Sequence, residues 1–244
     1  MSLKNKIKTK LSNYNINNSD NICNNLVKFN DLMIEYNQSH NLTSITEEND
    51  VIIKHFIDSL LPIDLFSNNS KIIDLGCGVT GNNTLYLLEK GKSVISCDFA
   101  KEALDVVGKI KGSKTLCFDM LDKFPFQDNS SELVIADLSL HYFRKDDTYR
   151  IIDEIKRVLK PNGYLILRLN SVNSTEYKKL SNDNNIEKIE ENLFFANNME
   201  KRFFDKQSID EFFNGLIPIC VREENMSRYN PDKIVWKLAF QNLK

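Results

Sequence analysis

The chain begins with a stretch in which apolar residues recur at the spacing of an amphipathic helix. In residues 24–37 the apolar positions fall three or four residues apart, and a second apolar stripe runs over 51–60 behind an acidic first turn. We therefore expect a helical N-terminal cap over residues 1–66. The run Ser67–Ser70 is polar throughout and predicts a loop, so a boundary between two domains is placed there.

From residue 71 the pattern changes to short apolar runs that alternate with amphipathic stretches. The runs with strand character are 71–75, 92–98, 113–119, 132–138 and 164–170. Helical spacing covers the segments 82–91, 101–110 and 147–160. Strands that alternate with helices favour a parallel sheet with helices on both of its faces.

The last third of the chain adds an insertion and a hairpin to this pattern. Residues 171–206 are polar and irregular, and we interpret them as an insertion that could form a lid. A helix over 207–215 follows, and then two strands, 216–223 and 233–240, joined by a turn. The predicted fold class is α/β, a Rossmann-like, mostly parallel sheet of seven strands with a C-terminal antiparallel hairpin, formed by residues 67–244.

Composition and charge narrow the class of protein. The formal charge of −2 gives no general electrostatic attraction to nucleic acid. No apolar run approaches the roughly 18 residues that span a bilayer, and the N-terminus lacks the features of a secretory signal. The five cysteines form no C-x-x-C pair, which favours reduced thiols in a cytosol over a disulfide or zinc framework. We therefore expect a cytoplasmic protein without a membrane partner.

A glycine-rich turn follows the first predicted strand of the sheet. The stretch KIIDLGCGVTGNN places Gly76, Gly78 and Gly81 in a G-x-G-x-x-G pattern between a strand and a helix. Such a turn lets the backbone approach a ligand and directs helix N–H groups towards a negative group. A pyrophosphate and a carboxylate satisfy this requirement equally, so the turn alone does not separate a dinucleotide from a nucleoside that carries an amino acid.

Three acidic residues beside this turn favour the second kind of ligand. Asp98 ends the second predicted strand, where a carboxylate can accept both hydroxyls of a ribose. Asp119 ends the third, where it can accept an adenine N–H while the Met120 backbone contacts the ring. Asp74, just before the turn, suits a ligand with an ammonium group, which S-adenosylmethionine has and a nicotinamide dinucleotide lacks. Asp98 and Asp119 could instead be helix N-caps.

Over residues 71–170 the sequence resembles the class I S-adenosylmethionine-dependent methyltransferases. The successive motifs are IIDLGCGVTGNNTLYLLEKGKSVISCDFAKEAL, CFDMLDKFPF, VIADLSLHYF and EIKRVLKPNGYLIL. The resemblance implies that the cofactor is S-adenosylmethionine. It also implies the following contacts: Asp74, Gly76, Cys77 and Gly78 around the methionine part, Asp98 on the ribose, and Asp119 with Met120 at the adenine. The position of Gly81 departs from the family pattern by one residue, which leaves its role open. Phe99 and Phe126 could flank the adenine or pack in the core.

The segment ADLSLHYF follows the fourth predicted strand, where this fold places groups that meet the methyl acceptor. Asp137 could contact the methionine ammonium or orient the nucleophile. His141, with Tyr142 beside it, is a candidate general base because an ordinary histidine titrates near neutral pH. The alternative is that both rings only pack beneath a lid. Transfer from a sulfonium depends mainly on positioning, so a dedicated base is not required.

The N-terminal segment carries a second resemblance. Residues 28–66 contain Asn41-Leu42-Thr43 followed by Lys54-His55-Phe56-Ile57-Asp58-Ser59, and they resemble the entry segment of the bacterial 16S ribosomal RNA guanine-N7 methyltransferases. The F-P-G continuation of that family is replaced here by GVTGNNT. His40 and His55 have no Cys or His partners that would suggest a metal site.

Together these patterns predict a methyltransferase acting on a small-molecule acceptor. Ribosomal RNA is the first alternative acceptor. A nicotinamide-dependent oxidoreductase and a nucleotide-binding protein without turnover are two further alternatives from other classes.

Overall fold

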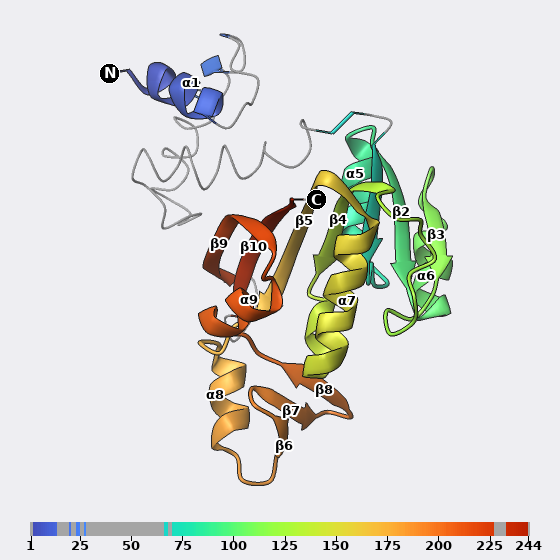
Figure 1. Cartoon of the computed structure of the whole chain (residues 1–244), viewed down its shortest axis with the longest axis vertical. Coiled ribbons are helices and arrows are strands. Elements are labelled where there is room, and N and C mark those ends of the chain that lie inside the picture. The colour runs from blue at the N-terminus through green and yellow to red at the C-terminus, as the bar shows by residue number, and fades with distance from the viewer. Residues whose placement is uncertain are drawn as a thin grey trace, which may run out of the picture. The chain divides into compact units, whose positions relative to one another are not determined.

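A computed structural model describes residues 2–13, 20, 23, 24, 27, 66, 67, 70–226 and 233–243 (Figure 1). The chain divides into two compact units, Met1–Ser67 and Asn68–Lys244. No helix among the described residues is long and apolar enough to cross a bilayer.

The described part of the first unit contains helix α1, Leu3–Asn13. Its apolar residues Ile7 and Leu11, four positions apart, are fully buried. Lys4 and Lys8, also four apart, both form ion pairs with Asp20. The amphipathic pattern of α1 is therefore expressed as one buried and one charged face. The helical stripe predicted within 24–37 lies almost entirely outside the described residues, and the stripe within 51–60 lies wholly outside them.

The second unit alternates strands and helices as its sequence pattern predicts. Up to the end of the fifth strand its elements are β1 Lys71–Leu75, α5 Asn82–Glu89, β2 Ser93–Asp98, α6 Lys101–Val107, β3 Lys114–Cys117, β4 Ser131–Asp137, the 3₁₀ helix η2 Leu140–Tyr142, α7 Lys145–Val158 and β5 Leu159–Asn170. The remaining elements are α8 Thr175–Asn182, β6 Glu187–Glu190, β7 Leu193–Ala196, β8 Met199–Arg202, α9 Lys206–Phe212, β9 Leu216–Met226 and β10 Lys233–Asn242.

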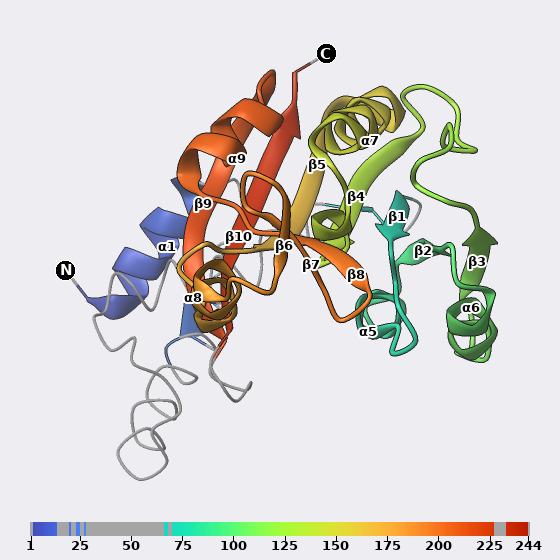
Figure 2. The ribbon, with the colours of Figure 1, turned by 90° about the horizontal axis from the view of Figure 1, so that it is seen from below.

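The large sheet has seven strands in the order β3-β2-β1-β4-β5-β10-β9. Strands β1 to β5 run parallel to one another, whereas β10 is antiparallel to both β5 and β9. Helices α5 and α6 cover one face and α7 and α9 the other (Figure 2). The predicted Rossmann-like sheet with its C-terminal antiparallel hairpin is confirmed. The strand order reverses direction at β1, which is where open α/β sheets bind ligands.

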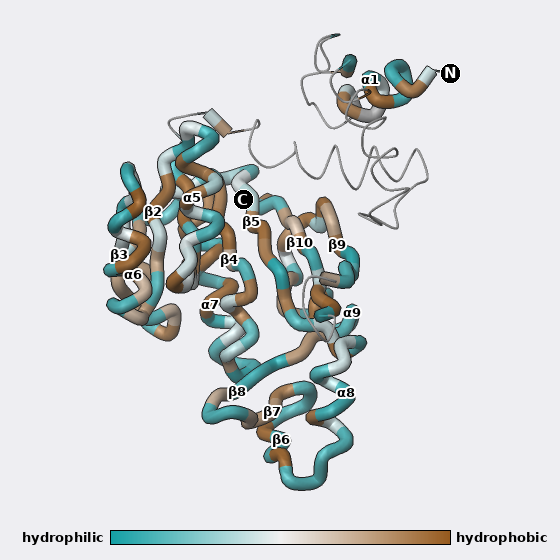
Figure 3. The backbone as a smooth tube through the Cα atoms, turned by 180° about the vertical axis from the view of Figure 1, so that it is seen from behind, coloured by the Kyte–Doolittle hydropathy of each residue, from teal (hydrophilic) through white to brown (hydrophobic). Residues whose placement is uncertain are grey.

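Burial follows the apolar pattern along the chain. Helix α7 turns Ile151, Ile152, Ile155 and Val158 into the core, and the residues between them are charged. The central strands are mostly hydrophobic, while α8 and the loop after it are hydrophilic (Figure 3). A sheet buried on both faces requires the near-continuous apolar runs that marked these strands in the sequence.

The interpretation of residues 171–206 as irregular is wrong. They form helix α8 and a second antiparallel sheet of three strands in the order β6-β7-β8. Asn192, Asn197 and Asn198 have positive φ in its turns, a conformation that asparagine tolerates better than most residues. Phe194 and Phe203 are buried, and each packs edge-on against Tyr177 of α8. The high asparagine content therefore reflects tight turns and not the absence of structure.

The loop that joins β3 to β4 is held to α7 by one arginine. The Arg157 guanidinium donates to the carbonyl oxygens of Phe124 and Phe126, at 3.0 and 2.8 Å. It also donates to both carboxylate oxygens of Glu154, each at 2.7 Å. Glu154 in turn accepts the backbone N–H of Phe124 at 2.7 Å. This bonding fixes the loop on whose first residues Asp119 and Met120 lie.

Arg157→Lys is expected to lower the free energy of unfolding by about 1–3 kcal/mol, because one ammonium group cannot replace the branched guanidinium on Phe124, Phe126, Glu154 and Asp128. Urea denaturation measures the change. The matched control is Arg150→Lys, on the exposed face of the same helix, where Arg150 pairs with Asp147 three residues away. A control change within about 0.5 kcal/mol is expected; equal losses in the two variants would contradict this account of the loop.

Candidate active site

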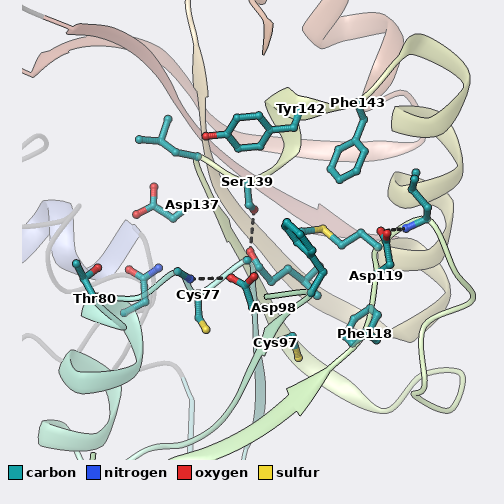
Figure 4. Close-up of a pocket in the computed structure, with 18 of the residues that line it drawn as sticks. Cys77, Thr80, Cys97, Asp98, Phe118, Asp119, Asp137, Ser139, Tyr142 and Phe143 are labelled. Atoms are coloured by element: carbon teal, nitrogen blue, oxygen red, sulfur yellow. Dashed lines mark hydrogen bonds between the residues drawn. The ribbon is translucent and has the colours of Figure 1, made fainter. Parts of the chain in front are cut away.

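A pocket of about 700 Å³ lies at the carboxyl ends of strands β1, β2 and β4 (Figure 4). Its wall is formed by the following segments: the turn after β1, the ends of β2 and β3, the segment after β4 and the start of β8. The lining residues predicted from the sequence are Gly76, Cys77, Gly78, Asp98, Phe99, Asp119, Met120, Asp137 and Tyr142. Two predicted site residues, Asp74 and His141, do not line it.

The three glycines of the turn have positive φ, but their surroundings differ. A Cβ added to Gly76 would lie 2.5 Å from the Cβ of Ser139, so this glycine allows the turn after β1 to lie against the segment after β4. A Cβ added to Gly78 would meet nothing within 4 Å. At Gly81 it would lie 2.9 Å from Val107 of α6, so the third glycine allows two helices to pack closely. The role that the sequence left open for Gly81 is therefore packing.

The carboxylate of Asp98 connects the glycine turn to the end of β2. One oxygen accepts the Gly78 N–H at 2.9 Å, and the other accepts the Ala100 N–H at 3.0 Å. Helix α6 has Ala100 as its N-cap residue, so Asp98 is not the helix cap that the sequence allowed as an alternative. Each carboxylate oxygen can accept more than one hydrogen bond, so Asp98 keeps acceptor capacity on the side that faces the pocket.

Asp119 and Met120 line the pocket from the turn that follows β3. Asp119 is exposed, and one of its oxygens accepts the Leu121 N–H at 2.9 Å. No helix begins after it, so the capping alternative fails here as well. Phe99 is 74% exposed and lines the pocket, so core packing is the wrong interpretation for this ring. Phe126 is buried in the core cluster, as core packing predicts.

Asp74 lies beneath the pocket and acts through its neighbours. Its side chain is buried and accepts hydrogen bonds from Asn83 Nδ2 at 3.2 Å and Thr84 Oγ1 at 3.3 Å. Burial raises the pKa of this carboxyl to about 6, although the two hydrogen bonds oppose the shift. Asp74 is buried and does not line the pocket, whereas Asn83, which donates to it, does.

Asp137 and Ser139 follow the end of β4. Asp137 forms a two-point ion pair with Arg168, its partner in register on β5. Ser139 Oγ donates to the Leu75 carbonyl oxygen at 2.7 Å, which ties this segment to the end of β1. Arg168 itself is not among the residues that line the pocket.

His141 and Tyr142 are adjacent but have different surroundings. Tyr142 lines the pocket and is 45% exposed. His141 is 1% exposed, and its Nδ1 has no hydrogen-bond partner among the described residues. Burial places its pKa well below the ordinary histidine value, which keeps the ring neutral near pH 7. A general-base role for His141 is therefore not supported, because the ring is enclosed and does not reach the pocket wall.

Several lining residues had no signal in the sequence. Met199 and Glu200 come from β8, inside the segment that was predicted only as a possible lid. The remaining ones are Leu75, Thr80, Asn82, Asn83, Cys97, Phe118, Leu121, Leu138, Ser139 and Phe143.

Burial raises the pKa of the Cys77 thiol to about 12, so this cysteine has no thiolate for nucleophilic attack. Within the described ranges no three His, Cys, Asp or Glu side chains are grouped to hold a metal ion.

The charged side chains that line the pocket are all acidic among the described residues. Four of its residues carry carboxylates, Asp98, Asp119, Asp137 and Glu200. No Lys, Arg or His is found among the described residues that line it. Such a wall favours a ligand with positive groups and disfavours a polyphosphate.

Comparison with known proteins divides the chain into two regions. Residues 73–167 match the family model of the methyltransferase domain, and residues 22–81 match that of rRNA small subunit methyltransferase G. A ribosomal RNA small subunit methyltransferase G of Alkaliphilus oremlandii is 44% identical over 80 residues, which are 32% of this chain and 34% of that protein. An uncharacterized methyltransferase of Mycobacterium bovis is 34% identical over 115 residues, 47% of this chain and 44% of that protein. The chain thus spans between a third and a half of these relatives.

Solved structures agree on the fold. A S-adenosylmethionine-dependent methyltransferase of Methanosarcina mazei superposes with a TM-score of 0.64 at 22% identity, covering 74% of this chain and 95% of that one. The 1,6-didemethyltoxoflavin-N1-methyltransferase of Burkholderia thailandensis, solved with 1,6-didemethyltoxoflavin and S-adenosylhomocysteine, gives 0.55 at 14% identity and covers 72% of each chain.

Residues 73–167 thus match the methyltransferase-domain model, and the fold that contains them is that of S-adenosylmethionine-dependent methyltransferases of solved structure. The N-terminal region is in addition similar to the rRNA small subunit methyltransferases G. The methyltransferase class is confirmed over the nicotinamide-dependent oxidoreductase that the glycine pattern alone left open.

The pocket fits the cofactor of this class. The open space at Gly78 leaves room for a ligand against the turn, and Asp98 and Asp119 present acceptors to hydroxyl and amine donors. S-adenosylmethionine carries a sulfonium and an ammonium group, which match a wall that has carboxylates and lacks described basic residues.

Asp74→Asn is expected to remove a pH dependence of stability. In the folded protein the pKa of Asp74 rises from 3.8 to about 6, so the folded state binds this proton more tightly than the unfolded chain. Stability from this group is full at low pH and is lost as pH rises through about 6, by about 3 kcal/mol at most. The free energy of unfolding of the variant, relative to the parent protein, should therefore increase between about pH 4 and about pH 7.

Urea denaturation at several pH values measures this difference. Asp105→Asn, which neutralises an exposed carboxyl on α6, is the control and should show no such trend. A constant difference between the Asp74 variant and the parent protein across this range would contradict the expectation.

Substitutions at the first two glycines are expected to separate folding from ligand binding. Gly78→Ala introduces only the strain of a left-handed alanine, about 1–2 kcal/mol, but it adds a methyl group at a residue that lines the pocket. Gly76→Ala adds a collision with Ser139 and should cost about 3 kcal/mol or more. Urea denaturation and calorimetry with S-adenosylhomocysteine test the pair. Equal stability losses, or unchanged affinity in Gly78→Ala, would refute this assignment of roles.

Proposed function

We propose that this protein transfers a methyl group from S-adenosylmethionine to a small-molecule acceptor. The observation that carries the proposal is the convergence of Asp98, Asp119 and the Gly76–Gly78 turn on one pocket. These groups come from the ends of three neighbouring parallel strands, where the cofactor of this class of domain would be held.

Each residue has a role that its surroundings support. Asp98, oriented by the N–H groups of Gly78 and Ala100, would accept the ribose hydroxyls. Asp119 would accept an adenine N–H, with Met120 beside it and the exposed ring of Phe99 at the pocket wall. The bound cofactor supplies a methyl group that its sulfonium already activates. The remaining task of the protein is to hold the acceptor in line with that group and to exclude water.

The charge of the wall favours a small acceptor over RNA. An RNA acceptor brings phosphates, which bind to lysine and arginine side chains. The described residues of the pocket wall include none of these, and they include the carboxylates of Asp98 and Asp119, with which no described cation pairs. The related fold of the Burkholderia thailandensis enzyme, solved with 1,6-didemethyltoxoflavin, supports a small acceptor in this architecture.

Ribosomal RNA is the second candidate acceptor. It is favoured by the match of residues 22–81 to rRNA small subunit methyltransferase G, most of which falls outside the described residues. The catalytic part of the chain instead matches the general methyltransferase domain. We expect ribosomal RNA from a strain that lacks this gene to keep all of its methylated guanines, as measured by mass spectrometry of RNA digests. Loss of one guanine methyl group would establish the RNA function.

Binding of S-adenosylhomocysteine tests the cofactor assignment directly. Calorimetry should show binding of this compound and none of NAD. Asp98→Asn should weaken the binding by about tenfold to about a hundredfold, because charge-assisted hydrogen bonds are lost. Asp105→Asn on the next helix should leave the affinity unchanged. Equal affinity in Asp98→Asn and the parent protein would remove Asp98 from the site.

A further inference from the structure

The part of the pocket formed by β8 and the segment after β4 has a different character from the part beside β2 and β3. Its wall is made by Leu138, Tyr142, Phe143, Met199 and Glu200. Tyr142 and Phe143 lie across the pocket from Asp98 and Cys97 (Figure 4). Tyr142 and Met199 are 45% and 46% exposed, which is high for large apolar side chains. This part of the wall is therefore mostly apolar, and strand β8 adds to it the carboxylate of Glu200.

Strand β8 is fastened to the segment after β4 at several points. The Arg144 guanidinium donates to Glu200 at 2.7 Å, and its Nε donates to the same carboxylate at 3.1 and 3.3 Å. Arg202 Nε donates to the Phe143 carbonyl oxygen at 3.1 Å. The Lys145 N–H donates to Glu190 of the neighbouring β6 at 3.0 Å. These bonds hold Met199 and Glu200 in place as a fixed wall of the pocket.

The four carboxylates of the wall fall into two kinds. Asp98 and Asp119 accept hydrogen bonds from backbone N–H groups, and no described cation pairs with them. Asp137 and Glu200 each form a two-point pair with an arginine, Arg168 and Arg144, that is not among the lining residues. Pairing compensates their charge and orients them, and a carboxylate oxygen that accepts one hydrogen bond can still accept another.

We propose that Glu200, oriented by Arg144, binds a methyl acceptor that carries no negative charge and presents an N–H or O–H donor, while Tyr142 and Met199 hold its apolar face. The inference rests on the proposed function and adds the chemical class of the substrate. An N–H or O–H group that reaches Glu200 meets a carboxylate that Arg144 already holds in place, so little side-chain entropy is lost when the hydrogen bond forms. An anion would find carboxylates and no described basic side chain on the wall.

Basic side chains close to this region are engaged elsewhere. Lys201, the residue after Glu200, donates to Glu176 of α8 at 2.6 Å. Arg168 is paired with Asp137. Neither lines the pocket, so neither is available to an anionic acceptor there.

The first experiment determines the charge of the acceptor. A low-molecular-weight extract of the source cells is separated by ion exchange into anionic, uncharged and cationic fractions. Each fraction, and purified small ribosomal subunits in parallel, is incubated with the protein and methyl-labelled S-adenosylmethionine. Label transferred to a compound of the uncharged or cationic fraction supports the inference. Label in the anionic fraction or in ribosomal RNA overturns it.

The proposed function and this inference fail in different ways. If S-adenosylhomocysteine does not bind in calorimetry, the cofactor assignment fails and the inference falls with it. If that compound binds but only an anionic acceptor is methylated, the protein is a methyltransferase and the inference alone is wrong. If it binds and no fraction accepts label, both the transferase activity and the inferred substrate class are rejected.

The second experiment tests Glu200 with the acceptor found in the first. Glu200→Gln should raise the KM for the acceptor about tenfold, because a charge-assisted hydrogen bond is replaced by a neutral one. The affinity for S-adenosylhomocysteine should stay unchanged, which also shows that the variant is folded. The matched control is Glu187→Gln, an exposed residue of β6 in the same small sheet that does not line the pocket. An unchanged acceptor KM in Glu200→Gln would exclude Glu200 from acceptor binding.

Discussion

The site depends on one close approach between two backbone turns. The turn after β1 lies so near the segment after β4 that the position of Gly76 has no space for a side chain. Three hydrogen bonds fix this arrangement. The Cys97 carbonyl oxygen accepts the N–H groups of Gly76 and Cys77, at 2.8 and 3.0 Å, and Ser139 donates to the Leu75 carbonyl oxygen. These bonds connect the segments that follow β1 and β4 with the end of β2, at the carboxyl edge of the sheet. The pocket lies at this edge.

The pocket has different chemistry along its length. Beside β2 and β3, Asp98 and Asp119 are held by backbone N–H groups and face the space where a nucleoside would bind. Towards β8, Asp137 and Glu200 are each paired with an arginine. Carboxylates without a described cation partner suit a cofactor that carries positive charge. Carboxylates paired with arginine suit an acceptor that donates hydrogen bonds and need not carry a positive charge. A single cavity can in this way hold two partners of different chemistry.

The N-terminal and C-terminal parts of the chain match different families, which limits what each match says about the methyl acceptor. The match to rRNA small subunit methyltransferase G ends at residue 81, within the glycine turn, and the methyltransferase domain model starts at residue 73. Tyr142 and Glu200, to which we assign binding of the acceptor, lie after the end of the first match. Similarity in the N-terminal region therefore does not by itself assign the acceptor, because the match does not include these two residues.

The pattern of residues along the chain was enough to predict the sheet, together with the glycines and acids at the carboxyl ends of its strands. Strands and helices repeat with fixed periods, and the glycines and acids that follow the strands occupy positions that any parallel sheet brings to one edge. Gly76, Gly78, Asp98 and Asp119 could be predicted for this reason. Only the tertiary structure decided that Asp74 and His141 are enclosed, because burial depends on which helix or strand covers a residue. It also decided that Met199 and Glu200 complete the wall, since their place is set by how β8 is fastened to the segment after β4. Contacts between elements that are distant in the chain leave no periodic pattern of apolar residues, so they cannot be predicted from a single sequence.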